Sequence, residues 1–360
     1  MSLGLTPFMQ TPPRSQTSWF RQTAGGGALA LLLLTTTRAQ TTDPNKPWPF
    51  APRATPTPPA AATPRPAAAT PGTIAPVATP RPFGAAAAPD QGPREVPLVE
   101  KKWDELVNKE VSKDGTTALE IEKDKWKHAE TENFILHYRR ATEAQKVARE
   151  VEYDLWFVAK ALGATKDRYQ RKSHVFIFED EDEWKKFVGL TKAPAWSASF
   201  AYGDELFLNV RRTEGPKRFD SNTLAHETTH AVVARLFPQK RWPLWLNEGW
   251  AEYMGGASVA ARKGQSVKGH QARLRLAEMP LATLEALKEY PSDEASVRQL
   301  YQTSEKLVRF LMDEMPKERI LQFIDAALAG KSLRDSVLEV YGDKVKDWPD
   351  FEKKFEKFTK

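Results

Sequence analysis

The most constraining stretch of this chain is residues 224–233, which read LAHETTHAVV. Residues four apart on an α-helix share a face, so His226 and His230 can bind one metal ion together. Glu227 would lie beside that metal, where a general base for an activated water belongs. Two imidazoles leave a zinc site incomplete, so the chain has to supply a third ligand from elsewhere.

A second segment, residues 243–253 with the sequence PLWLNEGWAEY, offers that ligand. Glu248 comes 18 positions after His230, which is enough chain for a helix end, a turn and a returning helix. Glu252 lies one helical turn beyond Glu248, and we expect it to accept a hydrogen bond from a ligating histidine; the alternative is an exposed helix charge. Asn247 either bonds one end of a substrate or caps the turn.

The two segments together resemble the gluzincin metallopeptidases of the peptidase-MA-like group. That group has the pattern HExxH followed by WLxEGxA, which stands here at residues 226–230 and 245–251. The resemblance extends from about Thr131 to the C-terminus. It implies that His226, His230 and Glu248 bind one zinc ion and that Glu227 is the catalytic base. The spacing is close but not identical to that of the aminopeptidase branch, and nothing at the N-terminus resembles that branch, so aminopeptidase specificity is not carried over.

Peptide hydrolysis also builds an oxyanion, which needs a hydrogen-bond donor facing the metal. In the aminopeptidase branch of the gluzincins this donor is a downstream tyrosine, and Tyr301 resembles that placement. A buried core aromatic is the alternative for Tyr301, and Tyr253 is its rival as donor. Four further histidines lack ligand spacing and are expected to be structural or surface residues: His128, His137, His174 and His270.

The first 39 residues are typical of a secretory signal. Arg14 and Arg21 precede an uncharged, mostly apolar run at residues 24–34, and small residues lead up to Gln40. The run is too short for an ordinary transmembrane helix, and an uncleaved short anchor is the alternative to cleavage. We therefore expect an extracytoplasmic protein that is periplasmic, secreted or tethered to a membrane or envelope through its N-terminus.

Residues 40–97 are predicted to be a disordered spacer. Residues 43–97 hold 16 of the 27 prolines, interleaved with alanine and threonine, and such a composition cannot pack a core. The first 97 residues carry 8 Lys and Arg against 3 Asp and Glu, which is +5 of the total charge of +6 and leaves +1 for residues 98–360. The folded part therefore gives no case for binding nucleic acid. The chain has no cysteine, which excludes disulfides and thiolate metal sites.

We expect residues 98–360 to form one α+β, zincin-like domain, with an α/β lobe at 98–236 and a mainly helical lobe at 237–360. Strands are predicted at 134–138, 175–178 and 205–210, and the last of these is expected to be either a substrate-aligning edge strand or a plain core strand. Helix predictions cover residues 141–162, a metal-site helix capped by Asp220 or Ser221, a helix from Pro243 to Gly255–Gly256, and an amphipathic helix at 351–360 that either docks or touches a membrane.

These observations favour an exported zinc-dependent peptidase with a peptide or protein as its substrate. The alternative is an exported binding or structural protein that keeps the zinc site without turnover. Glu227 argues against that alternative, because a site kept only for structure needs no base. A tethered scaffold using only the spacer and the terminal helix would leave the HExxH pattern unexplained.

Overall fold

The computed structural model describes residues 92–93, 95–169, 171–191, 193, 197–212, 218–266 and 277–358. All of them belong to one compact unit, Pro47–Lys360. The predicted signal segment and residues 40–91 of the predicted spacer lie outside the described residues. The packed chain begins before the first strand, since Val96 is buried and its carbonyl accepts a hydrogen bond from Gln145.

The described residues form a six-stranded mixed sheet in the order β1-β2-β3-β4-β6-β5. β3, β4 and β6 run parallel, whereas β1, β2 and β5 are antiparallel to their neighbours. The strands are β1 (Val99–Lys101), β2 (Lys127–Glu130), β3 (Phe134–Tyr138), β4 (Ser173–Phe178), β5 (Ser199–Tyr202) and β6 (Glu205–Asn209). The three predicted strands are β3, β4 and β6, which are buried along their whole lengths, as their β-branched and aromatic runs indicate.

Of the two alternatives for residues 205–210, the edge strand is wrong and the core strand is confirmed. β6 lies between β4 and β5, so β5 is the edge strand. Gly203, with φ +58°, allows the short turn that folds β5 back onto β6. The alternation in β6 did not reveal this hairpin, because β5 is a four-residue strand with no period of its own.

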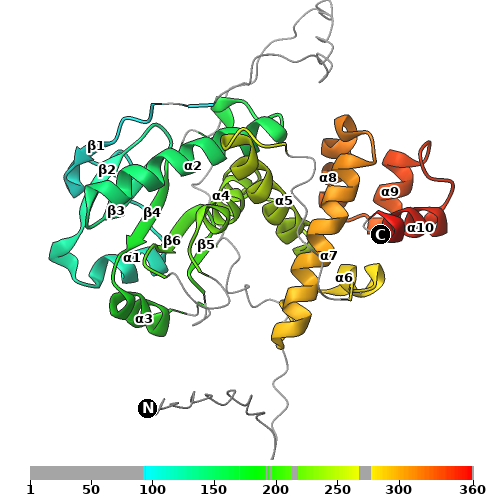
Figure 1. Cartoon of the computed structure of the whole chain (residues 1–360). Helices are drawn as coiled ribbons and strands as arrows, with labels where there is room; N and C mark the ends of the chain where they lie inside the picture. Colours follow the sequence, from blue (N-terminus) through cyan, green and yellow to red (C-terminus); the bar gives the residue numbers. More distant parts are fainter. Residues whose placement is uncertain are drawn as a thin grey trace, which may run out of the picture. The chain divides into compact units, whose positions relative to one another are not determined.

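Helices cover both faces of the sheet (Figure 1). On one face, α2 (Ala141–Ala161) and α4 (Ser221–Leu236) pack against residues such as Leu136 and Leu208. On the other face, α1 (Lys113–Glu120) and α3 (Glu181–Leu190) pack on an aromatic layer that includes Phe176 and Phe207. Alternate strand residues therefore belong to two different hydrophobic clusters, as the two-residue period of a strand requires.

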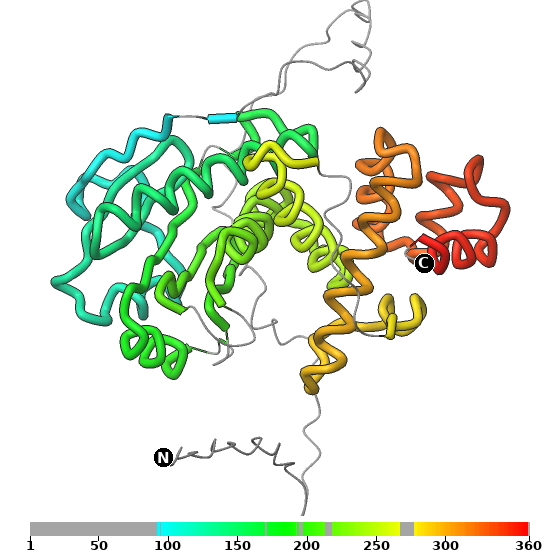
Figure 2. The backbone as a smooth tube through the Cα atoms, viewed as in Figure 1, coloured from blue at the N-terminus to red at the C-terminus, as the bar shows by residue number. Residues whose placement is uncertain are grey.

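Beyond the sheet the described chain is helical, as Figure 2 shows from yellow to red. The α-helices are α5 (Leu244–Arg262), α6 (Leu281–Ala286), α7 (Glu294–Asp313), α8 (Ile320–Leu328), α9 (Leu333–Tyr341) and α10 (Trp348–Lys357). Short 3-10 helices lie at Trp103–Glu105, Lys123–Lys125, Lys166–Tyr169 and Lys317–Arg319. The fold is thus α+β, with the sheet lobe followed by a helical lobe.

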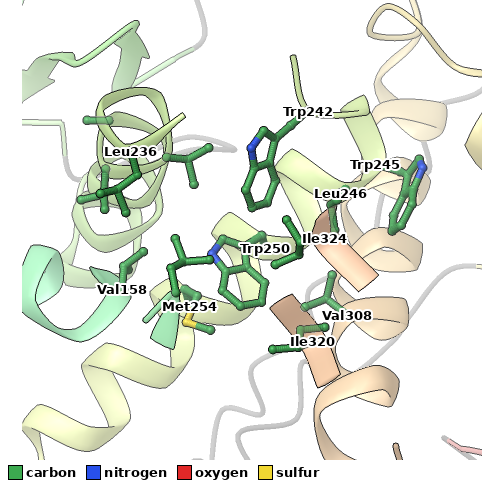
Figure 3. Packing of buried hydrophobic residues seen from close by; sticks show 14 of the residues in the cluster. Val158, Leu236, Trp242, Trp245, Leu246, Trp250, Met254, Val308, Ile320 and Ile324 are labelled. Carbon is green, nitrogen blue, oxygen red and sulfur yellow. The ribbon is translucent and has the colours of Figure 1, made fainter. Parts of the chain in front are cut away.

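α5 joins the two lobes because it packs against both α4 and α7. Its Trp250 and Met254 lie between Leu236 on one side and Val308 and Ile324 on the other (Figure 3). Burying one such large side chain stabilises the fold by roughly 1.5–3 kcal/mol. The helix that carries part of the candidate site is therefore fixed by packing on two sides.

The prediction that the helix after Pro243 ends at Gly255–Gly256 is wrong, because α5 continues to Arg262. Gly255 is needed for helix packing instead: a Cβ at that position would lie 3.0 Å from the backbone nitrogen of His226. The glycine after the true end of α5 is Gly264, with φ +67°. A glycine that permits close contact and a glycine that ends a helix look alike in the sequence.

The terminal helix is docked. Phe351 and Phe355 of α10 are buried, and both rings pack edge-on against Phe310 of α7. Among the described helices, none combines the length and the apolar character needed to span a bilayer.

Candidate metal centre

α4 presents the two histidines of the HExxH pattern on one face. It begins after Asp220, whose side chain accepts a hydrogen bond from the backbone N–H of Thr223 and so caps the helix. The polar residues between the histidines are satisfied within the helix, since Thr228 and Thr229 donate their hydroxyls to carbonyls one turn earlier. A helix rich in polar residues can therefore be buried at the centre of the fold.

α5 brings Glu248 to the same place. Its side chain is fully buried, and its neighbour Gly249 lets α7 approach so closely that a Cβ would lie 2.4 Å from the Ser304 carbonyl oxygen. This close contact fixes the position of α5 beside α4, and hence the position of the Glu248 carboxylate.

Three side-chain atoms converge at the centre of this helix pair. The Nε2 atoms of His226 and His230 lie 3.1 Å apart, and Glu248 Oε2 lies 3.5 Å from the first and 3.6 Å from the second. Zinc bonds of about 2.0–2.2 Å place the ligands of a tetrahedral ion roughly 3.3 Å apart. The three atoms therefore form a triangle of the size of one face of the ligand tetrahedron around a zinc ion.

The condition of the Glu248 oxygen supports the same assignment. Within the described part of the chain, Glu248 Oε2 is buried and makes no hydrogen bond, although it is the atom that faces both imidazoles. Burial would raise the pKa of Glu248, but the imidazoles of His230 and His226 hold that pKa well below its usual range. A buried carboxylate oxygen that stays ionised and has no donor is suited to a cation.

Glu252 lies where the sequence predicts a partner for a ligating histidine. Its Oε1 is 3.3 Å from Nδ1 of His226. Burial would lower the pKa of His226, but the carboxylates of Glu252, Glu248 and Glu227 outweigh it and raise the pKa to about 10. The centre thus carries a surplus of negative charge. Glu252 is placed to keep a proton on Nδ1, which leaves the lone pair of Nε2 available to bind a metal ion.

Glu227 is buried beside the triangle. Its Oε1 accepts a hydrogen bond of 3.1 Å from the hydroxyl of Ser199 in β5. His226, Glu227 and His230 each offer one potential metal-ligand atom, and these three atoms lie within 4.8 Å of one another. Glu248 Oε2 lies within 3.6 Å of both imidazole nitrogens, which is the geometry of a third ligand, and Glu227 is a second carboxylate beside them.

A family model for the peptidase MA superfamily matches residues 158–358. The chain belongs to the peptidase MA superfamily. The matched range includes all of α4 and α5, and therefore every residue of the triangle. No curated protein matches the chain.

The other residues predicted for this peptidase MA site lie around the triangle. The Tyr301 ring, from α7, is centred 6.0 Å from the His226 ring. Asn247 precedes Glu248 in the first turn of α5. Burial, together with the charges of Asp313 and Glu305, raises the pKa of Tyr253, the rival donor. Of the two tyrosines, Tyr301 is the one whose ring lies near an imidazole of the triangle.

Two contacts of this peptidase MA site could not be seen in the sequence. Ser199 holds Glu227, and the hydroxyl of Tyr290 donates a 2.5 Å hydrogen bond to Oε1 of Glu248. Ser199 comes from a short edge strand, and Tyr290 from the segment between α6 and α7, and neither has a helical or strand period to mark it.

Three of the remaining histidines form a separate chain on the sheet. His137 Nδ1 lies 2.8 Å from His128 Nδ1, and His137 Nε2 lies 2.9 Å from His174 Nδ1. Burial holds the pKa of His137 well below its usual range and lowers that of His174 to about 3. They are structural residues of the sheet lobe, as expected, while His270 lies outside the described residues.

Proposed function

We propose that this chain is a zinc-dependent peptidase that hydrolyses peptide bonds in a peptide or protein substrate. The proposal rests on the convergence of two imidazole nitrogens and a buried, hydrogen-bond-free carboxylate oxygen in a member of the peptidase MA superfamily. Members of that superfamily are typically zinc-dependent. His226, His230 and Glu248 are the proposed ligands, and one zinc ion per chain is expected.

Bound zinc supplies Lewis acidity, which lowers the pKa of a water molecule and polarises a carbonyl group. Glu227 is the proposed general base. Its carboxylate lies beside both imidazoles, and the Ser199 hydroxyl donates a hydrogen bond that orients it. In that position it can take a proton from the attacking water and deliver a proton to the leaving amine.

Two neighbours prepare the site for this chemistry. Glu252 accepts a hydrogen bond from the Nδ1–H of His226, which leaves the Nε2 lone pair directed toward the centre. Tyr301 is the proposed donor to the oxyanion, because its ring lies against His226 from the helical lobe. Asn247, one residue before Glu248, is a candidate contact for the substrate.

We further propose that the protein works outside the cytoplasm. Support comes from the N-terminal pattern of arginines, short apolar run and small residues, and from the proline-rich segment that follows it. The segment would let the peptidase domain reach substrates at some distance from an N-terminal tether.

The experiment compares three variants of the full chain with the parent. Glu227→Gln keeps the shape of the side chain but cannot accept a proton, so it should still hold about one zinc ion while turnover falls at least ~100-fold. His230→Ala removes a ligand and should bind zinc much more weakly. Glu356→Gln, an exposed change in α10, is the matched control and should behave like the parent.

Zinc content and digestion of a peptide library are the two readouts. A Glu227→Gln protein that cleaves peptides as fast as the parent would refute the proposed base. A parent that binds zinc but cleaves nothing in the library would instead favour an exported, non-catalytic zinc protein with the peptidase fold.

A further inference from the structure

Tyr290 approaches the candidate metal centre from an unexpected direction. It lies in residues 287–293, between α6 and α7, and 38 % of its surface is exposed. Its hydroxyl nevertheless reaches the fully buried Glu248 and donates a 2.5 Å hydrogen bond to Oε1. An exposed segment therefore makes direct contact with the carboxylate that we assign as a ligand.

The two oxygens of Glu248 are used differently. Oε2 faces the Nε2 atoms of His226 and His230 and makes no hydrogen bond to any described residue, whereas Oε1 accepts a hydrogen bond from the Tyr290 hydroxyl. A carboxylate held in this way offers one oxygen to a metal ion and keeps the other turned toward its donor. Partners that hydrogen-bond a ligating carboxylate fix its orientation in this manner.

We propose that Tyr290 is a positioning residue that holds Glu248 as a one-oxygen ligand and so completes the metal centre from the helical lobe. The inference rests on the metal-binding part of the proposed function. It assigns to Tyr290 a role separate from that of Tyr301, which faces His226.

The surroundings of Tyr290 support a role for its hydroxyl more than for its ring. Tyr290 is partly exposed, so losing its hydroxyl is not expected to unfold the domain. It also leans on Tyr301, with ring centroids 6.4 Å apart, and Tyr301 in turn lies against His226. This line of rings keeps the hydroxyl directed at Glu248 and leaves the oxygen as the part of the side chain that touches the centre.

Replacing Tyr290 by Phe removes only that oxygen. Zinc affinity, measured by competition with a chelator, should fall about 10- to 100-fold, as is typical when a hydrogen-bond partner of a metal ligand is lost. The visible spectrum of the cobalt-substituted protein should also change, because Glu248 is then free to turn its second oxygen toward the metal. Melting of the metal-free protein should stay at the parent value.

Tyr341→Phe is the matched control. Tyr341 lies in α9, and its buried hydroxyl has no hydrogen-bond partner among the residues that the structure describes, so this variant loses the same atom away from the centre. Its zinc affinity and cobalt spectrum should equal those of the parent.

Each outcome decides the inference. Parent-like affinity and spectrum in Tyr290→Phe overturn it, and so does a fall in metal-free melting large enough to account for the weaker binding. These readouts need no turnover, so a parent that binds zinc without cleaving peptides refutes the peptidase proposal while leaving Tyr290 fully testable. A parent that binds no zinc overturns both.

Discussion

Gly249 lacks a Cβ, and both the packing of the helical lobe and the geometry of the centre depend on that absence. A Cβ there would lie 2.4 Å from the carbonyl oxygen of Ser304 and 2.9 Å from Val308 Cγ2, whereas ordinary van der Waals contact begins at 3.4 Å. The nearest obstacle is backbone, which cannot rotate away as a flexible side chain can. Gly249→Ala therefore has to push α5 and α7 apart by about an ångström.

Two effects of opposite sign set the size of the change. Overpacking of a core typically costs about 1–3 kcal/mol. Alanine is the better helix former by roughly 1 kcal/mol, and this offsets part of the loss. Because the clash is with backbone, we expect net destabilisation of about 1–2 kcal/mol, which for a domain of this size lowers the melting temperature by roughly 2–8 °C.

Gly189→Ala is the matched control. Gly189 lies near the end of α3, and a Cβ there would meet no described atom within 4 Å. This variant should gain the helix propensity without the clash and melt at or slightly above the parent temperature. Thermal unfolding followed by circular dichroism measures both variants. If Gly249→Ala melts together with Gly189→Ala, the close contact between α5 and α7 is not as described.

Zinc affinity should show the same displacement through the proposed ligand Glu248. Glu248 precedes Gly249 on α5, so separating α5 from α7 also moves the carboxylate relative to the imidazoles of α4. Zinc affinity should fall in Gly249→Ala and remain at the parent value in Gly189→Ala. Loss of stability with unchanged zinc affinity would show that α5 adjusts without moving the carboxylate.

Three further outcomes are expected. The pKa of His174 in the folded protein is about 3, below its ordinary value of 6.5, so on acidification the unfolded state takes up the proton first. The contribution of His174 to stability is therefore complete above pH 6.5 and is lost as the pH falls toward 3. In denaturant titrations between pH 6.5 and 4.5, the free energy of unfolding of His174→Asn should fall by about 2–3 kcal/mol less than that of the parent. An equal loss would refute this. Burial raises the pKa of Asp154 to about 7 from 3.8, so its contribution is complete below pH 3.8 and is lost as pH rises to 7; Asp154→Asn should flatten that part of the profile, and an unchanged profile would count against it. Mild proteolysis of the full chain should remove residues up to about Val96, whose burial protects the chain beyond it, and mass spectrometry identifies the resistant fragment. A fragment that begins well before Val96, or one that is unfolded, would contradict that boundary.

The core of the site could be predicted because helix geometry fixes it locally. Residues four apart share a face of any α-helix, so His226 lies beside His230 and Glu248 beside Glu252 whatever the rest of the fold. The approach of Glu248 to the histidines depends on α5 packing against α4, and the resemblance to a known family supplied that information. The buried strands could also be predicted, since most of their residues are apolar or aromatic.

What escaped prediction depends on contacts between distant segments. Ser199 reaches Glu227 because β5 forms an unforeseen edge strand, and Tyr290 reaches Glu248 from a segment with no hydrophobic period. The sequence predicts a helix end at Gly255, whereas this glycine allows α5 to touch α4 beside His226. In each case the sequence shows the residue type, while the neighbour that gives it meaning is set by tertiary packing.

The triangle also has a mechanical consequence for a chain that contains no cysteine. His226 and Glu248 mark the ends of a continuous stretch in which α4 ends, the chain turns and α5 begins. A metal ion held by both helices would act as a cross-link that closes this loop of about 20 residues, and closing a loop of that length restricts the unfolded chain by about 3 kcal/mol in the entropic model used for disulfides. Catalytic chemistry and the stapling of the two lobes would then depend on the same ion, so that losing it would loosen the junction between them as well as stopping turnover.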